Sequence, residues 1–140
     1  MVTLCLSNKN MVATRYYYKD TISDFIARDD MEIVGKLTIA YAHDINDETK
    51  KSWVSEIDTM KTVLRPYSER GSIFFEYNIP RMGRRADVIV LIDGIVFVLE
   101  FKTANQKFSR KAMVQVWDYA IDLKNFQEGC LDRVLLPIQV

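Results

Sequence analysis

The stretch 85–102, RADVIVLIDGIVFVLEFK, constrains the fold of this chain more than any other feature. It predicts two apolar strands joined at Asp93-Gly94. An Asp-Gly dipeptide between apolar runs favours a two-residue hairpin turn, because a type I′ turn needs positive φ at both central positions. That turn places Ile92 opposite Ile95, and the same register then places Asp87 opposite Glu100.

Asp87 and Glu100 are therefore expected in a non-hydrogen-bonded cross-strand pair, with Cβ atoms about 4.5–5.5 Å apart. Lys102 lies two residues beyond Glu100 and so is expected on the same side of the strand. Like charges in such a pair raise the pKa of one partner unless a cation lies between them. Two acids beside a lysine predict a divalent-metal site for phosphate chemistry. A structural Glu100–Lys102 ion pair is the alternative, and it leaves Asp87 unexplained.

The hairpin strands are almost continuously apolar, which is typical of a central sheet covered on both faces. We therefore predict an α/β fold with a mixed central sheet of about four strands flanked by helices. The remaining strands are expected at 71–79 and 133–140. Helices are expected from about residue 22, over 31–42, from about 47 to 64 and from about 110 to 126. Residues 1–15 are expected to form an N-terminal arm, and residues 16–140 the domain.

Two helices carry further candidate residues. Glu56 lies at the edge of the apolar face made by Trp53, Ile57 and Met60, where it could reach inward to a metal or simply face water. Gln115 and Tyr119 are one turn apart on the later helix and share a face. A Gln–Tyr pair is unusual in an apolar stripe and could hold a substrate or a group of the metal site.

The formal net charge is zero, but the middle of the chain is basic. Residues 61–111 carry ten basic and five acidic side chains. That excess suits a polyanion such as a nucleic-acid backbone, and ordinary surface charge is the alternative. The candidate phosphate-binding residues are Arg81, Arg84, Arg85, Lys107, Arg110 and Lys111.

The composition also excludes some classes of protein. No apolar run approaches the roughly 20 residues of a membrane span. Cys5 and Cys130 have no metal-ligand spacing, so we expect free thiols in a reducing compartment and a cytoplasmic protein.

The ordered set Glu56, Asp87, Glu100-Phe101-Lys102 and Gln115-Val-Trp-Asp-Tyr119 resembles the PD-(D/E)xK nuclease superfamily. Its last element resembles the Q-x-x-x-Y motif of the RecB-like branch. From residue 16 onward the chain is similar to the amino-terminal nuclease-like region of bacterial helicases with a Schlafen-type helicase domain. Ala86 stands where the motif has proline. The helicase portion is missing, so the resemblance implies an excised domain or a shortened gene product.

The resemblance implies a restriction-endonuclease-like core with the order αβββαβ, and a Mg²⁺- or Mn²⁺-dependent nuclease acting on DNA, with RNA possible. Asp87, Glu100 and the Phe101 carbonyl would bind the metal, with Glu56 as a possible further ligand. Lys102 would orient or deprotonate the attacking water, and Gln115 and Tyr119 would position the strand or the lysine.

Two other classes of function remain open from the sequence. One is a nucleic-acid-binding domain of the same fold with weak or no catalysis. The other is a protein-interaction module, including a homodimer, whose apolar strands pair between chains.

Overall fold

The computed structural model describes residues 15–41, 44–102, 109–126, 130 and 132–140. The helices are α1 (Ile22–Ala27), α2 (Asp30–Ala40), α3 (Asp47–Leu64) and α4 (Arg110–Phe126), and a 3₁₀ turn follows α3 at Arg65–Tyr67. The strands are β1 (Tyr18–Thr21), β2 (Gly71–Ile79), β3 (Arg84–Ile92), β4 (Ile95–Glu100) and β5 (Val134–Gln139).

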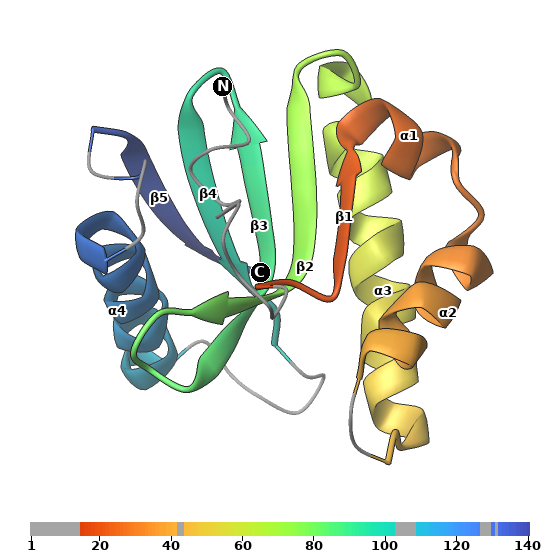
Figure 1. Ribbon diagram of the computed structural model, residues 1–140, viewed down its shortest axis with the longest axis horizontal. Helices are drawn as coiled ribbons and strands as arrows, with labels where there is room; N and C mark the ends of the chain where they lie inside the picture. Colours follow the sequence, from red (N-terminus) through yellow and green to blue (C-terminus); the bar gives the residue numbers. More distant parts are fainter. Residues whose placement is uncertain (1–14, 42–43, 103–108, 127–129, 131) are drawn as a thin grey trace.

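The five strands form one mixed sheet in the order β1-β2-β3-β4-β5 (Figure 1). Strands β1 to β4 pair antiparallel, and β5 pairs parallel to β4. The protein is thus an α/β fold, and from α3 onward the element order is the predicted helix, strand, strand, strand, helix, strand. The expected count of about four strands was one too low. The missed strand, β1, has only four residues, YKDT, and therefore too little apolar alternation to be recognised.

Local sequence signals set the element boundaries. Thr21 and Asn46 accept hydrogen bonds from the first turns of α1 and α3, as capping residues do. Ser109 Oγ accepts from the Ala112 N–H at the start of α4 (3.2 Å). Asp93 and Gly94 have φ values of 50° and 81°, which agrees with the predicted tight turn.

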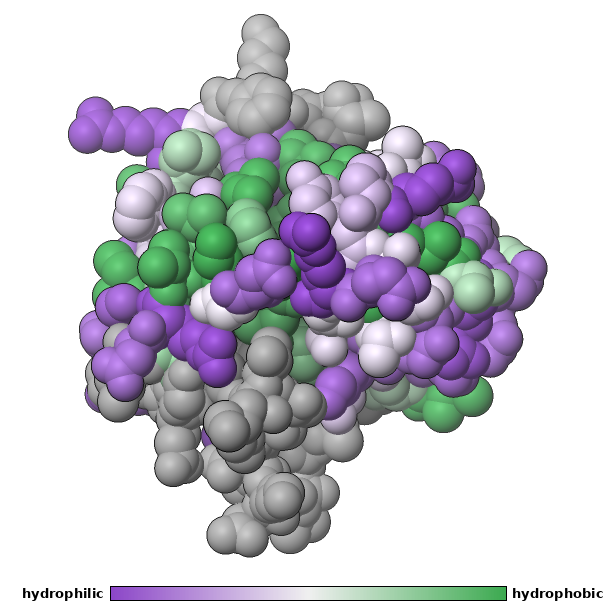
Figure 2. All heavy atoms as spheres, turned by 90° about the horizontal axis from the view of Figure 1, so that it is seen from above, coloured by the Kyte–Doolittle hydropathy of each residue, from purple (hydrophilic) through white to green (hydrophobic). Residues whose placement is uncertain are grey.

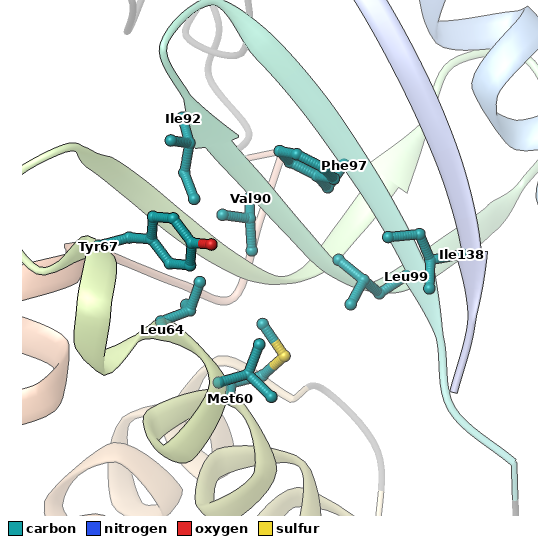
Figure 3. A pocket seen from close by; sticks show the side chains of 9 residues that line it. Met60, Leu64, Tyr67, Val90, Ile92, Phe97, Leu99 and Ile138 are labelled. Atoms are coloured by element: carbon teal, nitrogen blue, oxygen red, sulfur yellow. The ribbon is translucent and has the colours of Figure 1, made fainter.

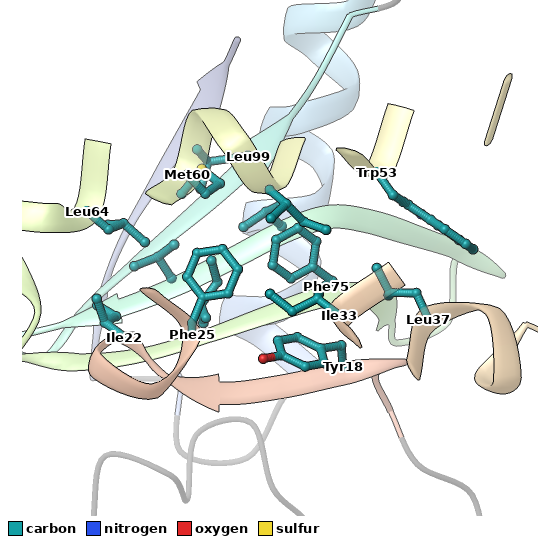
Figure 4. Close-up of a cluster of buried hydrophobic side chains, with 14 of the residues drawn as sticks. Tyr18, Ile22, Phe25, Ile33, Leu37, Trp53, Met60, Leu64, Phe75 and Leu99 are labelled. Carbon is teal, nitrogen blue, oxygen red and sulfur yellow. The ribbon is translucent and has the colours of Figure 1, made fainter. Parts of the chain in front are cut away.

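Helices cover both faces of the sheet, as the apolar hairpin predicted. On one face α1, α2 and α3 pack on the strands around a core with many aromatic side chains (Figure 4). Its largest members include Phe25, Trp53 and Phe75, all essentially buried. On the other face Tyr119, Ala120 and Leu123 of α4 pack against a second cluster from β2, β3 and β4.

Strands β2 and β3 bend where Glu76 faces Asp87. Side chains along β2 alternate between the two clusters up to Phe75, which belongs to the first. Regular alternation would place Tyr77 with Phe75, but Tyr77 and Ile79 belong to the second cluster. Glu76 lies between them with φ 53°. The far end of the β2–β3 hairpin accordingly turns toward α4 (Figure 1).

An apolar pocket of about 280 Å³ lies between α3, its following turn and strands β3 to β5 (Figure 3). Among the described residues, its lining has no Asp, Glu, His, Lys or Arg, and the Tyr67 hydroxyl is the one ionisable group in it. Hydrophobic side chains also reach the surface, and Figure 2 shows them among hydrophilic ones on the face seen from above. Within the described parts of the chain, no helix is both long and apolar enough to cross a membrane.

Two sequence expectations concern the cysteines and the N-terminal arm. Cys130 is buried and disulfide-bonded, so the expectation of a free thiol there was wrong, and the argument from thiols for a reducing compartment no longer holds. Two cysteines far apart in sequence carry no spacing from which a bond could be predicted. Cys5 and the arm, apart from Arg15, lie outside the described residues.

Candidate active site

Five carboxylates line one pocket of about 310 Å³. One is the exposed Glu48 of α3, and the other four are less exposed and come from four different elements: Glu56 of α3, Glu76 of β2, Asp87 of β3 and Glu100 of β4. The pocket lies between the first half of α3 and these strands, and its lining also includes Ser52, Trp53 and Phe101.

The hairpin holds Asp87 and Glu100 together. The register runs from Ile92 opposite Ile95 to Val88 opposite Leu99, as predicted, so the next pair is Asp87 and Glu100. The Asp87 N–H donates to Glu100 Oε1 (3.4 Å), and the Phe101 N–H donates to Asp87 Oδ2 (2.8 Å). Each carboxylate is therefore held by the backbone of the opposite strand.

Glu56 points into the protein rather than into water. Its side chain is 4% exposed, and the Ser52 hydroxyl one turn earlier donates to Oε1 (2.9 Å). Oε2 is buried and has no hydrogen-bond partner among the described residues. The helical pattern placed Glu56 only at the edge of the apolar face, so the extent of its burial could not be predicted from the sequence.

Burial raises the pKa values of these acids, and repulsion by acidic neighbours adds to the rise at Glu56 and Glu100. Burial, then Asp87 and Glu76, raise the pKa of Glu56 to about 8, although the Ser52 hydrogen bond lowers it. Burial and Asp87 are also the main causes that raise the pKa of Glu100, to about 9. Burial raises the pKa of Asp87, and the hydrogen bond from Phe101 opposes that rise. The folded pocket is therefore more stable when its acids are protonated or bind a cation than when two or more of them are ionised without one.

Glu76 is a site residue that the sequence did not reveal. Its Oε1 accepts a hydrogen bond from Trp53 Nε1 (3.2 Å), and its Oε2 lies 3.6 Å from Arg85 Nε. Burial raises its pKa, and Asp87 adds to that rise. One signal was available: Glu76 is the single charged residue in the strand GSIFFEYNI. Its left-handed backbone, which turns it toward the pocket, could not be predicted from the residue type.

Lys102 lies beside the pocket rather than in its lining, one residue beyond Phe101. Its backbone N–H donates to the Val140 carbonyl (3.1 Å), which continues the β4–β5 pairing. Its Nζ is shielded from solvent, and desolvation lowers its pKa. A lowered pKa makes an ammonium a better proton donor and its amine form more accessible near neutral pH.

Gln115 and Tyr119 form the predicted pair on α4, with Gln115 Nε2 donating to the Tyr119 oxygen (2.9 Å). Burial raises the pKa of Tyr119, and Glu100 raises it further, whereas hydrogen bonds with Arg84 and Gln115 lower it. The influence of Glu100 places this pair next to the acid pocket, on its α4 side.

The basic candidates lie in different surroundings. Arg85 pairs with Glu76 and stacks over the Tyr17 ring (4.4 Å from guanidinium carbon to ring centroid). Arg84 lies by Tyr119. Burial raises the pKa of Asp122 on α4, and Arg81 is close enough to that carboxyl to oppose the rise. Arg110 and Lys111 are exposed in the first turn of α4, and Lys107 lies outside the described residues.

The donor set fits a hard divalent cation by its chemistry. The pocket offers carboxylate oxygens, which Mg²⁺ and Mn²⁺ prefer, and the unpartnered Oε2 of Glu56 is a buried acceptor. A cation would also relieve the repulsion that helps to raise the pKa values of Glu56, Glu76 and Glu100. As the side chains stand, however, no three such ligands in the described part of the chain are close enough to hold one ion.

No protein-family model, curated protein or solved structure matches this chain.

Proposed function

We propose that this protein is a divalent-metal-dependent nuclease that hydrolyses phosphodiester bonds of DNA, with a restriction-endonuclease-like core of the PD-(D/E)xK type. The observation that carries the proposal is the pairing of Asp87 with Glu100 at the end of a buried hairpin, with Glu56 buried against them. The element order from α3 to β5 and the resemblance of the motif residues also support it.

Each site residue has a defined task in this proposal. Asp87, Glu100 and the Phe101 carbonyl would hold Mg²⁺ or Mn²⁺, and Glu56 would add a further oxygen. When bound, the metal would supply a nucleophilic water and stabilise charge on the phosphate. Lys102, with its lowered pKa, would orient or deprotonate the attacking water. Gln115 and Tyr119 position the scissile strand or the lysine from the α4 side.

The proposed context is the nuclease part of a helicase–nuclease, as the resemblance implies. The exposed Arg110 and Lys111, together with the arginines around the β3 start, would bind the backbone without reading bases. A catalytically weak nucleic-acid-binding domain is the competing outcome, and the same assay separates the two.

The test is cleavage of labelled single- and double-stranded DNA and RNA with Mg²⁺, Mn²⁺ or EDTA. We expect metal-dependent cleavage that falls by about 100-fold or more in Asp87→Asn and Lys102→Ala, because each removes a group acting on the reacting atoms. Asp93→Asn is the matched control, since this aspartate is exposed in the hairpin turn, with 63% of its side-chain surface accessible. Binding without any cleavage would favour the inactive domain, and equal cleavage by all variants would refute the site.

A further inference from the structure

We propose that Glu76 is a positioning residue of this site: it holds the Arg85 guanidinium at the edge of the acid pocket, where the guanidinium binds a backbone phosphate of the nucleic acid. The inference rests on the proposed function and adds a residue that the motif does not contain. It also gives Arg85 a specific task that the neighbouring arginines do not share.

Both oxygens of Glu76 have a partner, one in a hydrogen bond and the other in an ion pair. Oε1 accepts from the indole of the buried Trp53, and Oε2 pairs with Arg85 Nε. Only 17% of the Glu76 side-chain surface is exposed, against 35% for Arg85. The carboxylate is therefore anchored inside the protein, and the guanidinium that it holds still reaches solvent.

The backbone at Glu76 indicates that this placement matters. A φ of 53° is disfavoured for a residue with a side chain and is routine only for glycine. Strained backbone of this kind is retained where the surrounding structure over-determines it, often at functional sites. Here the conformation turns Glu76 toward Trp53 and the acid pocket, instead of leaving it to follow the alternation of β2.

Arg85 is held in a way that leaves it able to bind phosphate. It stacks over Tyr17 and pairs through Nε, and a guanidinium carries further N–H groups on its two terminal nitrogens. Arginine binds phosphate oxygens bidentately through such groups. Those acids of the pocket that are ionised repel an approaching phosphate, so a cation fixed at their edge offsets that repulsion where the substrate arrives.

The other arginines near the site do not have this arrangement. Arg84 is engaged with Tyr119, and Arg81 lies toward Asp122 on α4. Among the arginines around the start of β3, Arg85 is thus the one paired with a carboxylate of the pocket itself.

A double-mutant cycle tests the proposal with Glu76→Gln, Arg85→Gln and the double variant. Glutamine keeps an oxygen for Trp53 but removes the charge that holds Arg85. Cleavage of labelled DNA gives kcat and KM, and fluorescence anisotropy in Ca²⁺ gives the Kd. We expect each single variant to raise KM and Kd about tenfold, with little change in kcat, and the double variant to be no worse than Arg85→Gln. Glu32→Gln is the control, because this glutamate pairs with Arg28 away from the pocket.

Independent, multiplying effects of the two substitutions would overturn the proposal, because Glu76 would then not act through Arg85. Unchanged KM and Kd in Glu76→Gln would overturn it too. If Glu76→Gln unfolds, Arg85→Lys decides: a lysine cannot bind bidentately, so an unchanged KM refutes the role of Arg85. If the wild-type protein shows no metal-dependent cleavage, the proposed function and this inference are both refuted. Multiplying effects of the two substitutions, or unchanged KM and Kd in Glu76→Gln, refute the inference alone.

Discussion

At the scale of single residues, Glu56 combines a buried carboxylate with two acidic neighbours, and this placement opposes folding whenever the carboxylate is ionised. Its pKa is raised from 4.5 to about 8, chiefly by burial and then by Asp87. A carboxyl whose folded-state pKa lies above its unfolded value contributes stability below the unfolded pKa. That contribution is lost as pH rises through the folded pKa. The metal-free protein should therefore become less stable between about pH 5 and pH 8.

Glu56→Gln should remove much of this pH dependence. Glutamine has nearly the same shape and can still accept from Ser52, but it cannot ionise. We expect the variant to be more stable than wild type at pH 8.5 without divalent cations, by about 1–3 kcal/mol, and to differ less at pH 5. Urea unfolding at both pH values measures the two differences, with Asp58→Asn, a change on an exposed aspartate of α3 outside the pocket lining, as the control. A variant with the wild-type pH slope would contradict the buried, repelled state of Glu56.

Glu76→Gly separates backbone strain from function. Glycine adopts the φ of 53° without the penalty that a side chain causes, which amounts to about 1–2 kcal/mol. Losing the acceptor of the Trp53 indole offsets part of that gain, by about 1 kcal/mol. We expect the free energy of unfolding at pH 8 to be equal to or slightly above that of wild type, while nucleic-acid binding weakens. A large loss of stability would mean that Glu76 serves the fold first.

The sequence predicted part of this site for a simple reason. The turn at Asp93-Gly94 fixes a register, and a register fixes which residues face each other, so Asp87 opposite Glu100 followed from counting. The burial of Glu56 depends on where α3 crosses the sheet, and periodicity places that residue only at an edge. Glu76 depends on a local φ value, which no residue pattern specifies.

At the scale of elements, the sheet depends on close contact between β2 and β3 at Gly71. A Cβ at this position would lie 1.8 Å from the Leu91 carbonyl oxygen, a backbone atom that cannot move aside on its own. Gly71→Ala should therefore cost about 3 kcal/mol or more, because the two strands must separate at the end of their pairing. Denaturant unfolding measures this cost.

Gly35→Ala provides the matched comparison for Gly71→Ala. Gly35 lies inside α2, and a Cβ there meets nothing within 4 Å. Alanine is the better helix former, so we expect this variant to be about 1 kcal/mol more stable than wild type. Similar losses in both variants would contradict the steric argument at Gly71.

The predicted boundaries of several elements agree closely with the observed ones. These elements have a capping residue, a helical repeat or an apolar run bounded by Gly or Pro. α3 and β2 begin and end where the sequence analysis placed them, because Asn46, Pro66, Gly71 and Pro80 mark those ends. β1 was missed because its pairing with β2 depends on distant residues, among them Phe75. A capping residue is visible in the sequence next to its helix, whereas pairing with a distant strand gives no signal within the sequence of β1 itself.

The edge of β5 that pairs with no other described strand bears on the possible homodimer. Val140 both donates to and accepts from β4, so alternate residues of β5 bond to that strand and the intervening ones, including Pro137, face outward. Proline has no N–H, and its position therefore removes a donor from the exposed edge. A homodimer formed by extending the sheet through β5 is disfavoured by this arrangement.

At the scale of the whole molecule, the acid pocket joins two halves of the fold. Glu56 comes from the layer of α1 to α3, whereas Glu100 is close enough to Tyr119 of α4 to raise the pKa of that phenol. A cation in this pocket would contact residues from α3, β3 and β4 at once. It would be bound by the folded chain alone, because the unfolded chain does not bring these acids together, and binding to the folded state alone raises stability.

Divalent cations should therefore raise the unfolding temperature, and more so at pH 8.5 than at pH 5.5, since protons compete for the same oxygens. At a metal concentration about 100 times Kd the gain is about 2.7 kcal/mol, or several degrees for a chain of this size. Scanning fluorimetry with MgCl₂ or MnCl₂, against NaCl of equal ionic strength, measures the shift. Glu100→Gln should abolish it, and Asp93→Asn should leave it intact. Equal shifts in both variants would place the cation elsewhere on the surface and remove the physical basis of the proposed metal site.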